Sequence, residues 1–192
     1  MESYAFVLVS LIAIASVSHS VAQSLTHGAF PVEKLLINPI PTVTQLQFYM
    51  QAVDTGGNET TYRVSNSSIT DSSPAKFGFV DIFDNLLTET PDPSSNIVGR
   101  SQGIFGTSDL SEVAVYNDLN VYFTSGIYNG STLHIAGRFP VFTGYRELFV
   151  AGGTGYFRLA TGIVTLREIA VDSMTMSAVV EFNVTVVHPI LA

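Results

Sequence analysis

Residues 125–137 read SGIYNGSTLHIAG and contain the clearest folding signal in this sequence of 192 residues. The dipeptide Asn129-Gly130 at the centre of this stretch is a strong β-hairpin signal. Runs rich in aromatic and β-branched residues lie on either side of it, NVYFT at 120–124 and STLHIAG at 131–137. The pattern predicts two antiparallel strands joined by a turn at Asn129-Gly130.

Other parts of the chain show the same short-strand pattern. Residues 45–51 alternate between polar and apolar, and residues 178–187 place Val180, Phe182, Val184 and Val186 on one face and polar side chains on the other. No stretch keeps helical spacing over three turns. About eight short strands with tight connections predict an all-β domain, either a sandwich or an up-and-down barrel, whose closure removes exposed strand edges. The remaining strands are predicted at 77–83, which ends in Asp84-Asn85, and at 98–105, 148–150 and 163–166, with a Ser-, Thr- and Asn-rich loop between 58 and 75.

The composition excludes several classes of protein. The chain is 46% hydrophobic and only 12% charged, which is too apolar for a disordered chain and predicts a packed domain. Its net charge is −8 and it has no basic run, so nucleic acids and anionic membranes are poor candidate partners. It has no Cys, which excludes disulfides, thiolate zinc sites and cysteine nucleophiles.

The N-terminal segment is predicted to be a secretory signal peptide, residues 1–22. The apolar run at 4–17 is too short to span a bilayer, and Ser20-Val21-Ala22 is a small-x-small cleavage pattern. An N-terminal anchor helix is the alternative. Cleavage after Ala22 leaves residues 23–192 as one domain, secreted to the cell exterior and with no membrane attachment.

Four sequons gain meaning from this predicted secretion. Each is an N-glycan acceptor only where it is exposed, and an unmodified Asn is the alternative at every one. Asn58 and Asn66 flank a polar stretch, and Asn129 lies in the predicted hairpin turn. Asn183 alternates with apolar residues in a strand, where subunit contacts could cover it.

Motifs for phosphate, metal or acyl-transfer chemistry are missing from the sequence. The run AGGTG at 151–155 resembles a phosphate cradle, but no Gly-Lys-Ser/Thr follows it and no helix is predicted after it, so a backbone role for its glycines is favoured. His27, His134 and His188 are scattered without metal-ligand spacing, and no metal site is predicted. No G-x-S-x-G elbow occurs.

Several longer motifs appear in an order that is typical of one family. They are FGFVDIFDNLLT at 77–88, PDPSSNIVGRSQG at 91–103, SGIYNGSTL at 125–133, Arg146-Glu147 and GGTGYFR at 152–158. Together they resemble the signature of plant dirigent proteins, and the likeness runs from about residue 46 to residue 188.

This resemblance implies a fold and an activity. The fold is an eight-stranded antiparallel barrel of the allene-oxide-cyclase type, usually trimeric, with a pocket at one barrel mouth. Typical members bind no cofactor. A separate laccase or peroxidase makes phenoxy radicals from monolignols such as coniferyl alcohol, and the dirigent protein orients the radicals so that coupling gives an optically active lignan. The implied location is the plant apoplast.

The resemblance also implies substrate-binding residues, namely Asp84, Phe105, Phe139 and Arg146. Asp84 matches the first acid of the family's Asp-Asp pair, and Arg146 matches a pocket arginine whose fixed charge can anchor a phenolic oxygen. Structural roles are the alternatives: Asp84 as a turn cap, Arg146 paired with Glu147 or with a strand neighbour, and the two Phe as barrel filling.

This sequence departs from the family pattern at three pocket positions. Gln51-Ala52 replaces His-Asp, Phe105 replaces a Tyr, and Phe139 replaces an Asp or Asn that many members have. A pocket without these polar groups is poorer at proton transfer. With two acids lost, we expect the Arg146 guanidinium to be available to a phenolic oxygen.

Three classes of function follow. The leading one is a secreted, non-catalytic protein that imposes regio- and stereoselectivity on phenoxy-radical coupling. The second is a quinone-methide-processing enzyme of the pterocarpan-synthase type. The third is a secreted phenolic-binding or defence protein without coupling activity. Partners in the leading case are phenolic radicals, the oxidase that acts upstream, and further copies of this chain in a homo-oligomer, a dimer or a trimer.

Overall fold

A computed structural model describes residues 41–172, 174 and 177–189. The predicted signal peptide, its cleavage site and His27 lie outside the described residues. Within the described ranges, no helix has the length and apolar character needed to cross a bilayer.

The described chain consists almost entirely of strands. They are joined by short loops and by two single-turn 3-10 helices, η2 (Gly126–Tyr128) and η3 (Gly155–Phe157). The strands are β1 (Pro41–Ala52), β2 (Thr61–Ser65), β3 (Val80–Thr88), β4 (Ile97–Thr107), β5 (Ala114–Phe123), β6 (Thr132–Pro140), β7 (Arg146–Thr154), β8 (Thr161–Asp172) and β9 (Ser177–Pro189).

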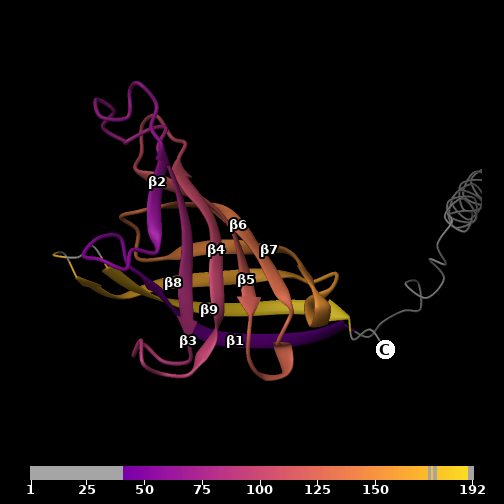
Figure 1. Cartoon of the computed structure of the whole chain (residues 1–192). Coiled ribbons are helices and arrows are strands. Elements are labelled where there is room, and N and C mark those ends of the chain that lie inside the picture. The colour runs from indigo at the N-terminus through magenta and orange to yellow at the C-terminus, as the bar shows by residue number, and fades with distance from the viewer. Residues whose placement is uncertain (1–40, 173, 175–176, 190–192) are drawn as a thin grey trace, which may run out of the picture. The chain divides into compact units, whose positions relative to one another are not determined.

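These strands form one antiparallel sheet that closes on itself. The order is β1-β9-β8-β7-β6-β5-β4-β3-β2, and β1 also pairs with β3, so eight strands make a barrel and β2 is an extra strand on β3. Figure 1 shows β1 (indigo) beside β9 (yellow), although they are far apart in sequence. The closing pairing is short, from Tyr49↔Thr88 to Gln51↔Leu86. The predicted eight-stranded antiparallel barrel is confirmed.

The hairpin expected around Asn129-Gly130 is also confirmed, because β5 and β6 pair antiparallel from Ala114↔Pro140 to Tyr122↔Thr132. Its connection is longer than a two-residue turn and includes η2. Asn129 has φ −50° and ψ 131°, Gly130 has φ 82°, and the Ser131 N–H donates to the Tyr128 carbonyl at 2.9 Å. This is the geometry of a type II turn, in which glycine supplies the one positive φ.

Two sequence predictions near β3 are wrong. The segment predicted as a loop between 58 and 75 contains β2, and Asp84-Asn85 lies inside β3 and not at its end. The two polar residues indicated the end of a strand. In the structure their side chains have partners: Arg100 pairs with Asp84, and Thr60 Oγ1 donates a hydrogen bond to Asn85 Oδ1 at 2.6 Å. Polar side chains with partners are compatible with a strand interior.

The glycines of residues 151–155 have backbone roles, as the sequence predicts. Gly155 has φ 60°, and a Cβ at Gly153 would lie 2.6 Å from the carbonyl oxygens of Thr132 and Phe157. The chain here ends β7 and turns into η3. Only glycine allows both the positive φ and this close approach of backbones.

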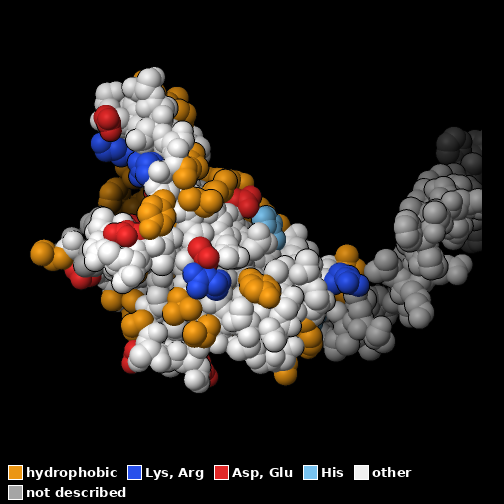
Figure 2. Space-filling view, in the orientation of Figure 1, with side chains coloured by type: hydrophobic (Ala, Val, Ile, Leu, Met, Phe, Trp, Pro, Cys, Tyr) orange, Lys and Arg blue, Asp and Glu red, His pale blue; other side chains and the backbone are white. Residues whose placement is uncertain are grey.

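The outer wall of the barrel exposes apolar side chains in two cross-strand rows. One row consists of Tyr62, Ile82 and Ile104, which are directly paired across β2, β3 and β4. The other row is staggered by two residues between β9 and β8: it contains the direct pairs Val43↔Val187 of β1 and β9 and Phe149↔Ile163 of β7 and β8, and Ile163 pairs in turn with Thr185 of β9. Figure 2 shows hydrophobic side chains (orange) on the face over β2, β3 and β4.

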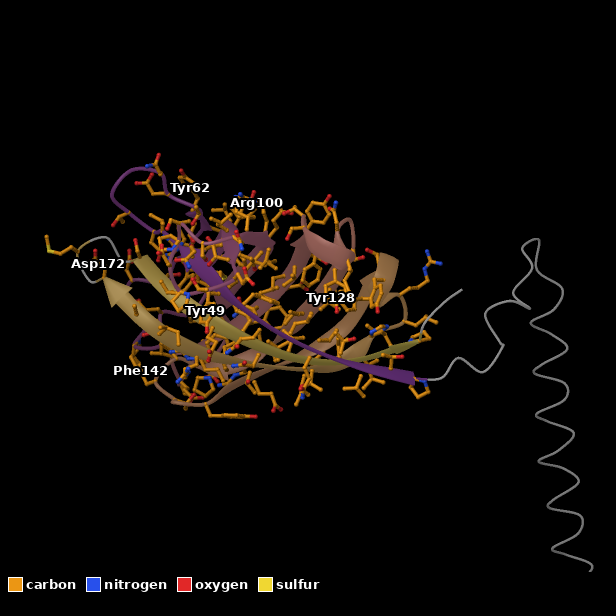
Figure 3. The ribbon with its side chains drawn as sticks, turned by 90° about the horizontal axis from the view of Figure 1, so that it is seen from below. Tyr49, Tyr62, Arg100, Tyr128, Phe142 and Asp172 are labelled. Carbon is orange, nitrogen blue, oxygen red and sulfur yellow. The ribbon has the colours of Figure 1, made fainter. Side chains whose placement is uncertain are left out.

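The two ends of the barrel differ. At the end where β1 begins and β9 ends, η2 and η3 bring together an aromatic cluster of Phe123, Tyr128, Tyr156, Phe157 and His188. Phe157 is fully buried, and His188 is also buried, with Nε2 2.9 Å from Thr44 Oγ1. Figure 3 places Tyr128 toward this end and Asp172 toward the other. The cluster fills one end and leaves the other for a cavity.

Candidate functional site

A cavity of about 600 Å³ opens at the end of the barrel opposite the aromatic cluster. This volume lies within the ~300–1,000 Å³ of ordinary ligand sites. Its wall is mainly apolar, with deep contributions from Leu119, Leu166, Val180 and Phe182. The loop 141–145 between β6 and β7 lines its mouth with Phe142, which is exposed.

Five consecutive strands line half of this cavity with alternating polar and aromatic side chains. Around the wall from β3 to β7 they are Asn85, Phe105, Asn117, Phe139 and Arg146. In a ring of eight strands β3 and β7 are opposite each other, because three strands separate them in either direction. Asn85 and Arg146 therefore come from opposite walls, and Asn117 of β5 comes from midway between them.

Arg146 lies at the mouth, and its side chain is 17% exposed. Its Nη1 donates to Oε2 of Glu168 on the neighbouring strand β8 at 3.3 Å, and its Nη2 donates to the Val141 carbonyl at 2.8 Å. The guanidinium carbon is 5.3 Å from the centre of the Phe139 ring, within cation–π range. The pairing with a strand neighbour was one of the sequence alternatives, and it coexists with a place in the cavity wall.

Asp54 contributes an acid at the rim of the cavity. It follows β1, lines the cavity and remains exposed on its outer side. Partial burial raises the pKa of Asp54, and the charge of Asp81 adds to the rise, while the Thr61 hydroxyl opposes it. Thr61 also lines the cavity. The cavity therefore has an acid at its rim. Asp54 lies two residues after Ala52, the position at which the dirigent pattern has an acid.

Asp84 does not line this cavity. Its side chain points to the outer side of β3, where it accepts a hydrogen bond from Arg100 Nε. Its neighbour Asn85 points inward, because successive residues of a strand face opposite sides of the sheet. Of the four residues predicted to bind substrate, the structure places Phe105, Phe139 and Arg146 in the cavity wall and Asp84 outside it.

Four polar residues of the cavity were not predicted from the sequence, namely Asp54, Thr61, Asn117 and Glu168. Asp54 lies in the irregular segment after β1, where strand periodicity gives no direction. Glu168 is placed beside Arg146 by the register of β7 and β8. A signal for Asn117 existed, because it alternates with Val115 and Leu119, which also line the cavity.

This arrangement suits a neutral or anionic aromatic ligand. Aromatic and aliphatic walls can pack against rings, a guanidinium can donate hydrogen bonds to a phenolic oxygen, amides can donate and accept hydrogen bonds, and a carboxyl group can exchange protons. Within the described residues, no group of three His, Asp or Glu side chains is arranged to hold a metal ion.

Comparison with known proteins identifies the family. A family model described as a Dirigent-like protein matches residues 43–187, which is the whole barrel from early β1 to late β9. The chain belongs to the dirigent family.

Curated dirigent relatives are similar over most of the chain. Dirigent protein 23 of Arabidopsis thaliana is 40% identical over 146 residues, which cover 76% of this chain and 78% of the relative. Pterocarpan synthase 1 of Glycine max is 34% identical over 148 residues, covering 76% and 78%.

The solved structures agree with this dirigent assignment. The pterocarpan synthase dirigent protein GePTS1 superposes with a TM-score of 0.76 at 30% identity, covering 85% of this chain and 99% of that one. The pterocarpan synthase dirigent protein PsPTS1 gives a TM-score of 0.69 at 33% identity, covering 77% and 96%.

Proposed function

We propose that this dirigent protein binds an oxygenated phenol in the barrel cavity and sets the stereochemistry of its oxidative coupling. The observation that supports this proposal is the combination, in one cavity of about 600 Å³, of the aromatic walls Phe105 and Phe139 with the cation of Arg146. A separate laccase or peroxidase forms the phenoxy radicals, with coniferyl alcohol as the reference substrate.

In this proposal the protein acts by position alone. Phe105 and Phe139 hold the ring, and a charge-assisted hydrogen bond from Arg146 fixes the phenolic oxygen. A ring held in this way exposes one face toward the mouth and has the other against the wall. A free-energy bias of about 1.4 kcal/mol between the two faces gives a tenfold preference.

The test is a laccase assay over a panel of phenols that includes coniferyl alcohol, with and without the protein. Coupled products are separated by chiral chromatography, and oxidation is followed by substrate consumption. We expect an enantiomeric excess in at least one product without a faster oxidation. Racemic products across the panel would exclude the directing function.

A second candidate is an enzyme that processes a quinone methide, as in the pterocarpan-synthase relatives. Asp54 favours it, because burial raises the pKa of this rim acid toward the range of a general acid. Such an acid protonates a leaving hydroxyl of an isoflavanol as its C–O bond breaks, so water departs, while a phenolic O–H conjugated with that carbon loses its proton to solvent and leaves a neutral quinone methide. A second phenolic hydroxyl then adds to the quinone methide carbon and closes the ring; its proton returns to Asp54, and the quinone methide oxygen regains a proton from solvent.

Incubation with an isoflavanol in the absence of any oxidant separates the candidates. An enzyme gives catalytic turnover there, and Asp54→Asn reduces the rate at least tenfold. A director gives no turnover without oxidant but changes the enantiomeric excess in the laccase assay. A phenol-binding or defence protein does neither, although it still binds phenols in calorimetry.

The proposal extends to the setting in which the protein acts. We infer a mature chain that begins near Gln23, is secreted to the apoplast and assembles into a homo-oligomer. The sequons Asn58, Asn66, Asn129 and Asn183 are all exposed in the structure, as glycan acceptors must be. Asn183 differs from the others because its Nδ2 donates to Glu181 Oε2 at 3.1 Å in the middle of β9.

A further inference from the structure

Asn117 is a polar residue of the cavity wall whose carboxamide has no protein partner and stays accessible from the cavity, since Ser101 Oγ is the one fully buried side-chain N or O atom without a partner among the described residues. It lies in β5, directly paired with Phe105 of β4 and Gly137 of β6, and is 8% exposed. Its side chain lines the cavity. Among the residues that the structure describes, none makes a hydrogen bond with its carboxamide.

The other buried amide of the cavity is satisfied. Asn85 Oδ1 accepts from Thr60 Oγ1 at 2.6 Å, and its Nδ2 lies 3.4 Å from the sulfur of Met50. Buried polar groups normally have such partners, because an unpartnered one keeps the cost of its desolvation. An amide that is left open toward a cavity therefore has a ligand as its natural partner.

We propose that Asn117 is a specificity-determining residue that binds an uncharged hydroxyl group of the aromatic ligand, separate from the oxygen that Arg146 binds. This proposal rests on the proposed function, because it concerns the same cavity. A carboxamide both donates and accepts hydrogen bonds, so it matches a hydroxyl, which does the same. It has no charge, and so gives no preference for a phenolate.

The positions of the two residues require two different ligand oxygens. β5 and β7 are separated by β6, which puts their backbones about 10 Å apart across the sheet. The Arg146 guanidinium is held at the mouth by Glu168 and Val141. Asn117 lies between the aromatic side chains of Phe105 and Phe139 on the flanking strands. A ligand that satisfies both residues carries oxygen at two well-separated positions of an aromatic skeleton.

Calorimetric titration with two probes tests this proposal. 4-Propylphenol has one oxygen, and 4-(3-hydroxypropyl)phenol has a second hydroxyl at the far end of the same skeleton. The measured quantity is the ratio of their Kd values. Asn117→Leu removes the amide at similar volume, and Asn117→Ala is a second variant in case leucine overfills the wall. The matched control is Asn120→Leu, on the exposed outer face of the same strand.

We expect either substitution at Asn117 to shift the Kd ratio about tenfold against the dihydroxy probe, and Asn120→Leu to leave it unchanged. Thermal unfolding checks that both Asn117 variants are folded. An unchanged Kd ratio in folded Asn117→Leu and Asn117→Ala proteins would overturn the role of Asn117 alone. If the wild-type protein binds neither probe, the phenol site of the proposed function fails, and the role of Asn117 fails with it.

Discussion

Glu168 accepts a hydrogen bond from Arg146 at 3.3 Å across the mouth of the cavity, between strands β8 and β7. The sequence had suggested a guanidinium with few competing acids, since Ala52 and Phe139 stand where relatives have acids. Glu168 and the Val141 carbonyl take part of that role. The remaining N–H groups of Arg146 are the ones that can reach a ligand, because a guanidinium has five.

Replacing Arg146 should abolish stereoselectivity. Arg146→Ala removes a charge-assisted hydrogen bond worth about 1.5–3 kcal/mol, enough to remove a tenfold facial preference. Arg146→Lys keeps the charge without the planar fork and should be partly active. Chiral chromatography of the laccase products measures this, with Arg158→Ala, an exposed arginine outside the cavity wall, as the control. Unchanged enantiomeric excess in a folded Arg146→Ala protein would remove Arg146 from the site.

Replacing Glu168 should have the opposite effect on binding. Glu168→Gln removes the carboxylate that competes for Arg146, so phenols should bind several-fold more tightly, most clearly above the pKa of the phenol. Calorimetric Kd values across pH measure the gain. Glu147→Gln is the matched control, because Glu147 lies on the outer side of β7 and accepts from Tyr145 OH at 2.5 Å. Weaker binding by Glu168→Gln would show that the ion pair holds Arg146 in its binding position.

Acid should weaken the barrel through Glu181 on the outer side of β9. Hydrogen bonds from Arg167, Asn183, Tyr49 and Gln47 lower the pKa of its carboxyl, with Arg167 the largest cause. The stability that Glu181 adds is present above the carboxyl pKa of the unfolded chain, about 4.3, and is lost as pH falls through the lower folded value. Urea unfolding of Glu181→Gln should show a loss of about 1–3 kcal/mol at pH 7 and a shallower decline below pH 4.5. Equal slopes for wild type and variant would contradict this.

The two apolar rows on the outer wall should be buried between copies of the chain. Two different rows on one molecule allow head-to-tail contacts, which close into a ring. Light scattering at micromolar concentration should give the mass of a dimer or trimer, and Ile82→Glu should lower it toward that of a monomer. A wild-type mass equal to one chain would refute the assembly.

Secretion and glycosylation can be tested together. Intact mass of material secreted from plant cells, before and after glycosidase, should match a chain that begins near Gln23 and carries glycans at some of Asn58, Asn66 and Asn129. Asn→Gln at each sequon assigns the occupied sites. An unglycosylated chain that retains Met1 would contradict both expectations.

The barrel was predictable because its signals are local. Alternation in β1 and β9 and the turn at Asn129-Gly130 each follow from a few neighbouring residues. β2 was missed because it is an extra strand on one side of β3. Its apolar residues Tyr62 and Val64 alternate with polar residues, but they are exposed to solvent and do not face the core. The direction of Asp84 was missed because adjacent residues of a strand face opposite sides, so an error of one position exchanges inside and outside.

The polar content of the cavity was less predictable, for a different reason. Phe105, Phe139 and Arg146 came from a family likeness, whereas Glu168 and Asn117 are placed by the register between neighbouring strands, which strand periodicity alone does not fix. Whether Asn117 has a partner depends on every residue around it. That is a property of the assembled wall, which no single segment of sequence contains.

In the part of the chain that the structure describes, the aromatic cluster fills one end of the barrel interior and the cavity that Arg146 lines opens at the other, while a separate groove lies beside the cluster, between β1, β4 and η2. The first ligand to enter this cavity lies deepest in it, and a second ligand reaches the first from the side of the mouth. The last to enter is then the first to leave. If two rings couple in this cavity, as proposed, the handedness of the product depends on which face the first ring turns toward the mouth, and the product leaves past Arg146 and Phe142 before another pair enters.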